Sequence, residues 1–340
     1  MKRTNNPLMQ YTLHRFFFFS VILLAEPLFS QQARLLVALN EVLTIGDTAG
    51  QTFSQVGDVA VDGEGNIFVT DRYQCKVMKY SPRGEFLAEY GKSGKGKMEF
   101  QSGPAKIDLC DTLVAVSDLS TARIVLLTNE LRPLGELNAV GPIVDIVGCR
   151  IDRMYCSVLP LSGDASEILG LYSRTAGMIA SIPLVNPPPQ LTLQLVLLCV
   201  DRMDNLIAAY ALLNRIMLYD SRGKPISSFR IDGLPEFVPT DTLSSDKFGI
   251  LPKGELIKGV AVHPESLIFV LSGDFSDHPS RDLYVLDYHG KLLQTYTLPR
   301  ETGLLYIDAK GFLYTREHNR TLVKKYRIQL SGHHKQKETK

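Results

Sequence analysis

Tryptophan is absent from this chain of 340 residues, and so are several sequence motifs of enzymes. There is no Gly-x-Ser-x-Gly elbow for a nucleophilic serine and no glycine-rich loop ending in Gly-Lys-Ser/Thr for a phosphate. Tandem Cys-x-x-Cys pairs, which are typical of zinc sites, are also missing. Neither sign of charge is in clear excess, because 37 Lys and Arg residues face 36 Asp and Glu residues. The composition therefore favours neither a nucleic-acid partner nor an anionic membrane.

Cysteine is scarce, and the cysteines that follow the N-terminal segment are odd in number: Cys75, Cys110, Cys149, Cys156 and Cys199. An odd number argues against a complete disulfide framework. Cys149 and Cys156 flank a predicted turn, which leaves a cross-strand disulfide open as one alternative. Small buried thiols in strand positions are the favoured interpretation.

One long apolar run is present, Phe16–Ala25, and it lies near the N-terminus behind basic residues. Glu26 ends it, short of the ~20 residues that a membrane span needs. The segment is typical of a secretory signal peptide with cleavage near Ser30. We therefore predict that residues 1–30 are removed, that the protein is secreted or periplasmic, and that no stable membrane span remains. The alternative is an uncleaved signal that anchors the chain in a membrane.

The stretch Val56–Gly91 contains short runs of β-branched, aromatic and long apolar residues, which suit half-buried strands. Turn residues separate the runs, for example at Asp62–Gly65 and Ser81–Gly84. No run is long enough to predict a helix from its periodicity. The stretch therefore predicts a four-stranded antiparallel sheet. Because one such sheet cannot bury both of its faces alone, it has to stack on copies of itself.

Imperfect copies of this stretch continue along the chain. The segments that align with Val59–Asp62 are Ile107–Cys110, Asp145–Gly148, Leu198–Asp201, Val260–His263 and Leu305–Asp308. A glycine turn later in each copy recurs at Gly84, Gly135, Gly177, Gly223 and Gly290. A period of roughly 40–50 residues predicts a β-propeller.

The two ends of the repeat region predict how the ring closes. Leu39–Gly46 parallels the last strand of the first copy, whereas the final copy, Gly303–Leu330, has only three clear strands. We therefore predict an all-β, six-bladed β-propeller of four-stranded antiparallel blades, closed by an N-terminal strand in the last blade. This arrangement removes an open sheet edge. The single, monomeric domain is predicted to span residues 31–330, followed by a polar C-terminal tail at residues 331–340.

The residues of the first copy resemble the NHL repeat. Val59–Asp62, Gly65–Val69 and Asp71 match its hydrophobic–Asp, Gly-Asn-hydrophobic-Val and Asp elements, and Gln74–Val77 corresponds to its Asn-x-Arg-Val element. Asn214–Ile216 keeps this last element better. The resemblance covers about residues 35–330 and implies a six-bladed propeller. The family includes protein-binding, RNA-binding and enzymatic members, so the resemblance leaves the function open.

Propeller ligands usually lie around the central channel, at the end where the inner strands begin. Asp58 is expected there, and the aligned positions in the other copies are Lys106, Val144, Leu197, Gly259 and Leu304. Calcium needs about six oxygen ligands and zinc three or four ligands. One carboxylate does not meet either need, so no channel metal is predicted. The aspartates aligned with Asp62 are interpreted as turn caps, and His263 as a turn residue.

We therefore predict an exported binding module or scaffold that engages a protein, peptide or envelope glycan through one loop-bearing face, without a cofactor. The candidate binding residues are Asp58, Lys106, Glu236, Asp241 and Asp246. The alternative that the resemblance implies is a metal-dependent lactonase- or lyase-like enzyme with its site at the central channel. The carboxylates of the loop 232–255 would then approach Asp58 and bind Ca²⁺ or Zn²⁺. No catalytic residue is assigned, and the binding module is the favoured hypothesis.

Overall fold

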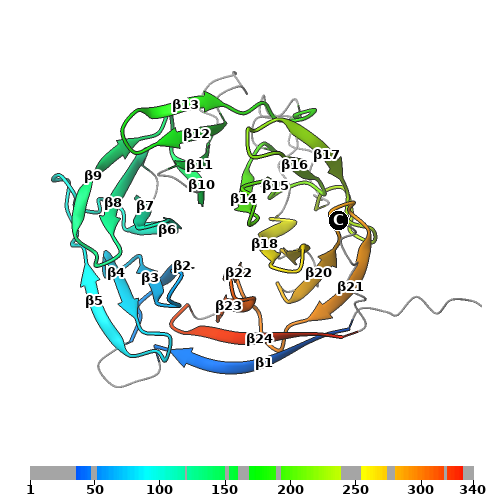
Figure 1. Cartoon of the computed structure of the whole chain (residues 1–340), viewed down its shortest axis with the longest axis horizontal. Coiled ribbons are helices and arrows are strands. Elements are labelled where there is room, and N and C mark those ends of the chain that lie inside the picture. The colour runs from blue at the N-terminus through cyan, green and yellow to red at the C-terminus, as the bar shows by residue number, and fades with distance from the viewer. Residues whose placement is uncertain are drawn as a thin grey trace, which may run out of the picture. The chain divides into compact units, whose positions relative to one another are not determined.

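The computed structural model describes residues 36–46, 52–118, 121–149, 153–159, 168–188, 193–238, 254–273, 280–317 and 320–331. They all belong to one compact unit, Arg34–Lys340. They form six four-stranded antiparallel sheets, which stand as blades around a central channel (Figure 1). The predicted all-β, six-bladed propeller is confirmed. No helix in the described ranges is long and apolar enough to cross a membrane.

In blades 1 to 5 the strands follow chain order from the channel outward. Blade 1 consists of β2 (Val56–Val61), β3 (Ile67–Asp71), β4 (Lys76–Tyr80) and β5 (Phe86–Tyr90). Blade 2 consists of β6 (Pro104–Cys110), β7 (Leu113–Asp118), β8 (Arg123–Thr128) and β9 (Pro133–Asn138). Blade 3 consists of β10 (Ile143–Cys149), β11 (Arg153–Val158), β12 (Leu169–Ser173) and β13 (Gly177–Ser181).

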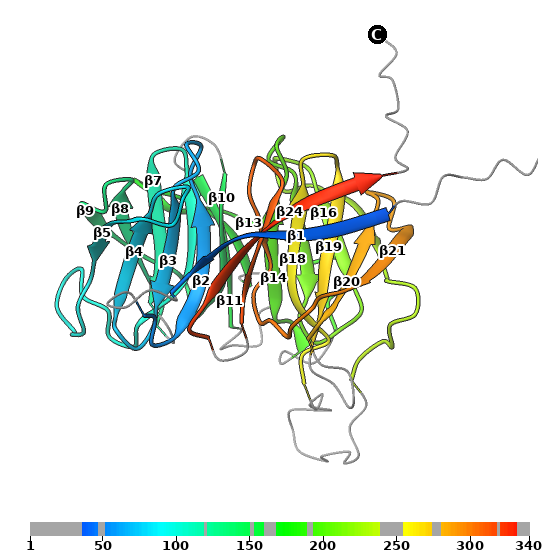
Figure 2. The ribbon, with the colours of Figure 1, turned by 90° about the horizontal axis from the view of Figure 1, so that it is seen from below.

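Blade 4 consists of β14 (Val196–Val200), β15 (Leu206–Tyr210), β16 (Ile216–Tyr219) and β17 (Pro225–Phe229). Blade 5 consists of β18 (Ile257–His263), β19 (Leu267–Ser272), β20 (Asp282–Leu286) and β21 (Leu292–Thr297). Because successive strands of a blade run in opposite directions, turns after the inner strands and turns after the second strands lie on opposite faces of the ring (Figure 2). The face where the inner strands begin is called the entry face below, and the opposite face the exit face.

Blade 6 joins the two ends of the chain. From the channel outward it consists of β22 (Tyr306–Ile307), β23 (Phe312–Arg316), β24 (Val323–Ser331) and β1 (Leu36–Ile45). β1 pairs with β24 from Leu36 opposite Ser331 to Ile45 opposite Val323. The predicted closure by an N-terminal strand is therefore confirmed. The last strand extends to Ser331, one residue past the predicted domain boundary at 330.

Apolar side chains fill the spaces between neighbouring blades. Each of the six blade interfaces contains one cluster of buried hydrophobic residues, such as the cluster of Val59, Val69 and Tyr314 between blades 1 and 6. Each blade thus buries both faces of its sheet against its two neighbours. This is the stacking that the short apolar runs of the repeat require.

The aspartates that follow the inner strands fix the turns at the exit face. The Asp62 carboxylate accepts hydrogen bonds from the backbone N–H groups of Glu64, Gly65 and Asn66. Asp201 and Asp308 accept equivalent bonds in their own turns. In the same position of blade 5, the N–H of Glu265 donates to Nδ1 of His263. The interpretation of these residues as turn caps is confirmed.

The cysteine in β11 settles the disulfide alternative. Cys156 is a free, buried thiol, and it pairs across the sheet with Ile146. Cys149 pairs with Arg153 instead. Cys156 therefore forms no disulfide, in agreement with the favoured interpretation for this residue.

Candidate functional site

The inner strands of all six blades line a central cavity of about 610 Å³. This volume falls within the range of about 300–1,000 Å³ that is usual for small-ligand sites. The cavity runs from Asp58 and Lys106 at the entry face to Asp201 and Asp308 at the exit face. It is the candidate functional site.

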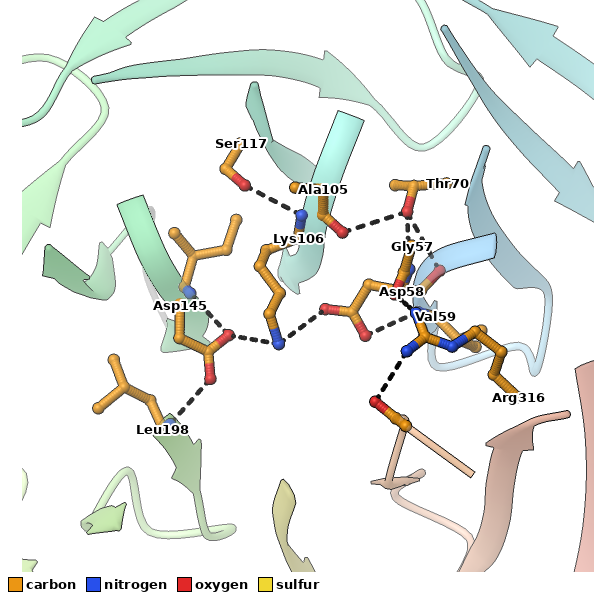
Figure 3. Close-up of polar contacts among 12 residues, drawn as sticks. Gly57, Asp58, Val59, Thr70, Ala105, Lys106, Ser117, Asp145, Leu198 and Arg316 are labelled. Atoms are coloured by element: carbon orange, nitrogen blue, oxygen red, sulfur yellow. Dashed lines mark hydrogen bonds and ion pairs between the residues drawn. The ribbon is translucent and has the colours of Figure 1, made fainter. Parts of the chain in front are cut away.

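A charged line crosses the entry end of the cavity (Figure 3). The Lys106 ammonium lies between two carboxylates, with its Nζ 3.2 Å from Oδ1 of Asp145 and 3.7 Å from Oδ2 of Asp58. The two aspartates are only 6 % and 8 % exposed. Each comes from a different inner strand: Asp58 from β2, Lys106 from β6 and Asp145 from β10. The line therefore joins blades 1, 2 and 3.

The backbone around this line is held by hydroxyl groups of the second strands. The N–H of Asp58 donates to Oγ1 of Thr70, and the N–H of Lys106 donates to Oγ of Ser117. The Thr70 hydroxyl also donates to the carbonyl of Ala105 in the next blade (Figure 3). These hydrogen bonds hold the backbone at Asp58 and Lys106 in place, as a preorganised site requires.

Aspartates of the channel also bind the N–H groups of neighbouring inner strands. Oδ2 of Asp145 accepts from Leu198 in blade 4 at 2.9 Å. Oδ2 of Asp108 accepts from Gly148 in blade 3 at 2.8 Å. The inner strand is a sheet edge, so these N–H groups have no strand partner on the channel side. We call such side-chain contacts between neighbouring inner strands inter-blade clasps.

Two residues of blade 6 make the corresponding contacts with blade 1. The hydroxyl of Tyr306 accepts from the N–H of Val61 at 3.3 Å. The guanidinium of Arg316 donates to the carbonyls of Val56 and Gly57, both at 2.8 Å. Arg316 thereby contributes a second cation close to Asp58 (Figure 3).

Burial shifts the protonation of these groups. Burial raises the pKa of Asp58, although Lys106 acts in the opposite direction. Burial raises the pKa of Asp108 to about 7, against the effect of the N–H groups of Gly148 and Leu109. Burial would lower the pKa of Lys106, but Asp145 and Asp58 together raise it, so the ammonium keeps its charge. The cavity therefore holds a charged Lys106 ammonium together with Asp58 and Asp108, whose pKa values lie above the ordinary range.

The other half of the wall has one lysine, Lys258, beside residues without charge. The positions equivalent to Asp58 in blades 4, 5 and 6 are Leu197, Gly259 and Leu304, and all three line the cavity. A Cβ atom at Gly259 would lie 2.8 Å from Cβ of Leu305, so blades 5 and 6 approach closely there. At the position of Asp58, three charged residues thus face leucine, glycine and leucine, with Lys258 next to the glycine.

The exit end of the cavity is polar again. The Asp201 and Asp308 carboxylates that cap turns also line it, and the Tyr288 hydroxyl donates to Oδ2 of Asp201 at 3.1 Å. His263 lies at the same end, and burial lowers its pKa. Seven aspartates line the described part of the cavity, against three Lys and Arg residues. Carboxyl groups therefore outnumber cations among the described lining residues, although the whole chain has a formal charge of +1.

The five sequence-predicted binding residues do not form one group. Asp58 and Lys106 come together at the entry end of the cavity. Glu236 instead forms an ion pair with Arg230 at 2.9 Å, with both side chains more than half exposed. Asp241 and Asp246 lie outside the described residues. Glu236 follows β17, whereas Asp58 belongs to an inner strand of another blade.

Sequence alignment missed two residues of the charged wall. Asp145, and not Val144, is the equivalent of Asp58, because Ile146 pairs with Cys156 of β11 as Val59 pairs with Val69 of β3. The N–H of Ile146 donates to Asp145 as the N–H of Val59 donates to Asp58. Asp108 was in the aligned segment but was not singled out. The sequence does mark Asp108, because it is a carboxylate at the inner-strand position where blades 1 and 5 have Ala60 and Ala261.

The described residues contain no group of three or more His, Cys, Asp or Glu side chains placed to hold a metal ion. The absence of a cofactor remains a prediction, since two of the carboxylates named for the metal-dependent alternative lie outside those residues.

Comparisons with known proteins support the fold. No protein-family profile matches the sequence, and no curated protein matches it. Among solved structures, a DUF4221 family member from Bacteroides vulgatus has a TM-score of 0.63 at 9 % identity, with 88 % of this chain and 99 % of that chain covered. Streptogramin B lyase has a TM-score of 0.52 at 11 % identity, covering 87 % and 98 %. The WD40 β-propeller domain of Doa1 has a TM-score of 0.52 at 12 % identity, covering 86 % and 97 %. These similarities concern the propeller fold alone.

Proposed function

We propose that this protein is an exported, NHL-like propeller that acts as a binding module for a protein, a peptide or an envelope glycan. The partner docks on the entry face, over the mouth of the central cavity. The observation that carries this proposal is the charged line at that mouth, where Lys106 is held between Asp58 and Asp145 on a fixed backbone. A fixed polar group at the centre of a rigid surface favours specific recognition, because little has to be ordered on binding.

The rim around this mouth is rigid as well. The Asp71 carboxylate accepts the N–H groups of Ser54, Gln55 and Tyr73, so it holds the turn between β3 and β4 to the connection that precedes β2. The Tyr73 side chain projects from this turn and is 75 % exposed. A tyrosine on a fixed turn offers a large contact area at a low cost in conformational entropy. The rim therefore suits an interaction surface.

The test compares one exposed side chain on each face. Purified protein is immobilised and exposed to an envelope extract of its source organism, and the retained material is quantified. Tyr73→Ser should reduce the retention of a specific partner at least fivefold. Met203→Ser is the matched control, because Met203 is 71 % exposed in a turn of the exit face. Equal retention by both variants, or loss with Met203→Ser alone, would contradict docking on the entry face.

A second candidate function is an enzyme at the cavity, of the lactonase or lyase class. The observation in its favour is Asp108, because a carboxyl group whose burial raises its pKa to about 7 suits general acid–base catalysis at neutral pH. Turnover of lactones or lyase substrates would support this candidate. Its loss in EDTA would indicate a metal-dependent reaction, whereas its loss in Asp108→Asn alone would indicate that the carboxyl group acts directly.

A further inference from the structure

Three arginines gather on the entry face, where blade 6 meets blade 1. We propose that Arg72, Arg316 and Arg320, called the arginine cluster below, bind an oxyanion group of a ligand: a sulfate, a phosphate or a carboxylate. This site needs no macromolecular partner and does not use the ion pairs of Lys106. The inference is therefore independent of the docking proposed above.

One short backbone segment brings the three arginines together. The N–H of Arg72, in the turn after β3, donates to the carbonyl of Gln55 at 2.9 Å. The N–H of the next residue, Val56, donates to the carbonyl of Arg320 at 2.7 Å. The Arg316 guanidinium donates to the carbonyl of Val56 at 2.8 Å. All three arginines are thus anchored to two adjacent residues at the start of blade 1.

The positive charges of the cluster oppose one another. Burial lowers the pKa of Arg316 to about 10, and the charges of Arg320 and Arg72 act in the same direction. Burial and the charge of Arg320 lower the pKa of Arg72 as well. The carboxylates of Asp58 and Glu255 act against this effect on Arg316, but neither forms an ion pair with it. A bound anion would offset the repulsion among the three cations.

The carboxylates that adjoin the cluster in the chain are bound elsewhere. Asp71 accepts hydrogen bonds from four backbone N–H groups of the rim. Glu317 forms ion pairs with two other cations, Arg300 at 3.2 Å and Lys324 at 3.4 Å. The protein itself therefore supplies no carboxylate partner for the arginine cluster among the residues that the structure describes.

Two buried donors of the cluster are left without an acceptor. Nε of Arg72 and Nε of Arg316 are both buried, and neither donates a hydrogen bond to a described residue. The other guanidinium nitrogens of Arg72, like those of the exposed Arg320, also have no partner among these residues. A guanidinium group offers only donors, in a planar fork that matches two oxygens of one oxyanion. An oxyanion therefore satisfies both the unpaired donors and the unpaired charge.

The experiment titrates the full-length protein, with isotope-labelled arginine, with sodium sulfate, sodium phosphate and sodium acetate. Heteronuclear NMR detects the Nε–H groups of Arg72 and Arg316, whose burial slows their exchange with water. At least one oxyanion should shift these signals to saturation, at an about tenfold lower concentration than chloride. A preference for acetate would identify a carboxylate ligand, and a preference for sulfate or phosphate a tetrahedral one. No saturable shift, or the same shift with sodium chloride at equal ionic strength, would overturn the inference.

Variants place the bound oxyanion at the cluster. Arg72→Gln and Arg320→Gln should each weaken its binding about tenfold, read from the Nε–H signal of Arg316 that both variants keep. Arg83→Gln is the matched control, because it removes the same charge from an exposed turn on the exit face of blade 1 and so leaves binding unchanged. Thermal unfolding confirms that each variant is folded, and Arg320→Gln alters only an exposed side chain. Equal loss in all three variants, or unchanged binding in both cluster variants, would contradict a site at the arginine cluster.

Discussion

The two halves of the cavity wall differ in the residues that occupy one equivalent position of the inner strands. At one position of the inner strand, blades 1, 2 and 3 have Asp58, Lys106 and Asp145, which are linked by ion pairs. At the same position, blades 4, 5 and 6 have leucine, glycine and leucine, and the blades meet by close packing. A buried ion pair is seldom more stabilising than well-packed apolar residues, so the charged half is not expected to be the more stable of the two.

The largest effect is expected when the cation of the charged half is removed. Lys106→Met leaves Asp58 and Asp145 buried without their partner, and should lower the free energy of unfolding by about 3 kcal/mol. Urea unfolding measures the change. The matched change in the apolar half, Leu304→Met, should cost less than about 1.5 kcal/mol because it conserves volume and character. Similar losses for the two variants would remove the distinction between the halves.

A smaller effect is expected from an added methyl group. In Gly148→Ala the new Cβ would lie 2.0 Å from the carbonyl oxygen of Leu109, a backbone atom of blade 2. In Gly259→Ala it would lie 2.8 Å from a side-chain atom of Leu305. Overpacking should therefore lower the free energy of unfolding by about 3 kcal/mol in Gly148→Ala and by roughly half as much in Gly259→Ala. Thermal or urea unfolding ranks the two. The reverse order would show that the apolar half is the tighter one.

The smallest effect concerns pH and Asp108. Burial raises the pKa of this carboxyl group to about 7 in the folded protein, so between about pH 4 and 7 the folded state binds more protons than the unfolded state. The stability that the protonated group contributes is complete below pH 4 and is lost as the pH rises through 7. The free energy of unfolding should therefore decline as the pH rises, and in Asp108→Asn this decline should be smaller by about 1–2 kcal/mol.

Urea unfolding at pH 5 and pH 8 tests this prediction. Asp58 and Asp145 also face Asp108, and burial raises the pKa of Asp58 as well, so the informative quantity is the difference between wild type and variant. An unchanged decline in Asp108→Asn would assign the pH dependence to other groups.

Most of the architecture could be predicted from the sequence, because it follows from local patterns. Turn residues such as Asp62 and short apolar runs define each strand, and their repetition defines the blades. The place of β1 could be predicted because its sequence resembles β5 and the last copy lacked a strand. These are properties of neighbouring residues, which the sequence displays directly.

The site was only partly predictable, because it depends on register and on contacts between blades. Asp58 and Lys106 were expected at the cavity, but the alignment of β10 was out of register by one residue and gave the position of Asp145 to Val144. A slip of one residue reverses which face a strand side chain occupies. Asp108 and Asp145 also accept hydrogen bonds from backbone N–H groups of the next blade, which carry no sequence signal. The path of a long loop is equally hidden, and Glu236 pairs locally with Arg230.

The pairing of β1 with β24 also determines the order in which the ring can form. The contact between Lys324 and Glu41 spans 283 positions of the chain, whereas blades 1 to 5 are each built from contiguous sequence. Contacts of such large sequence separation form late and slow the search for the native state. Blade 6 is therefore the last to be completed, after both Leu36–Ile45 and Val323–Ser331 have left the ribosome. Until β24 has been made, β1 has no strand to pair with, and their pairing then removes an open sheet edge of blade 6.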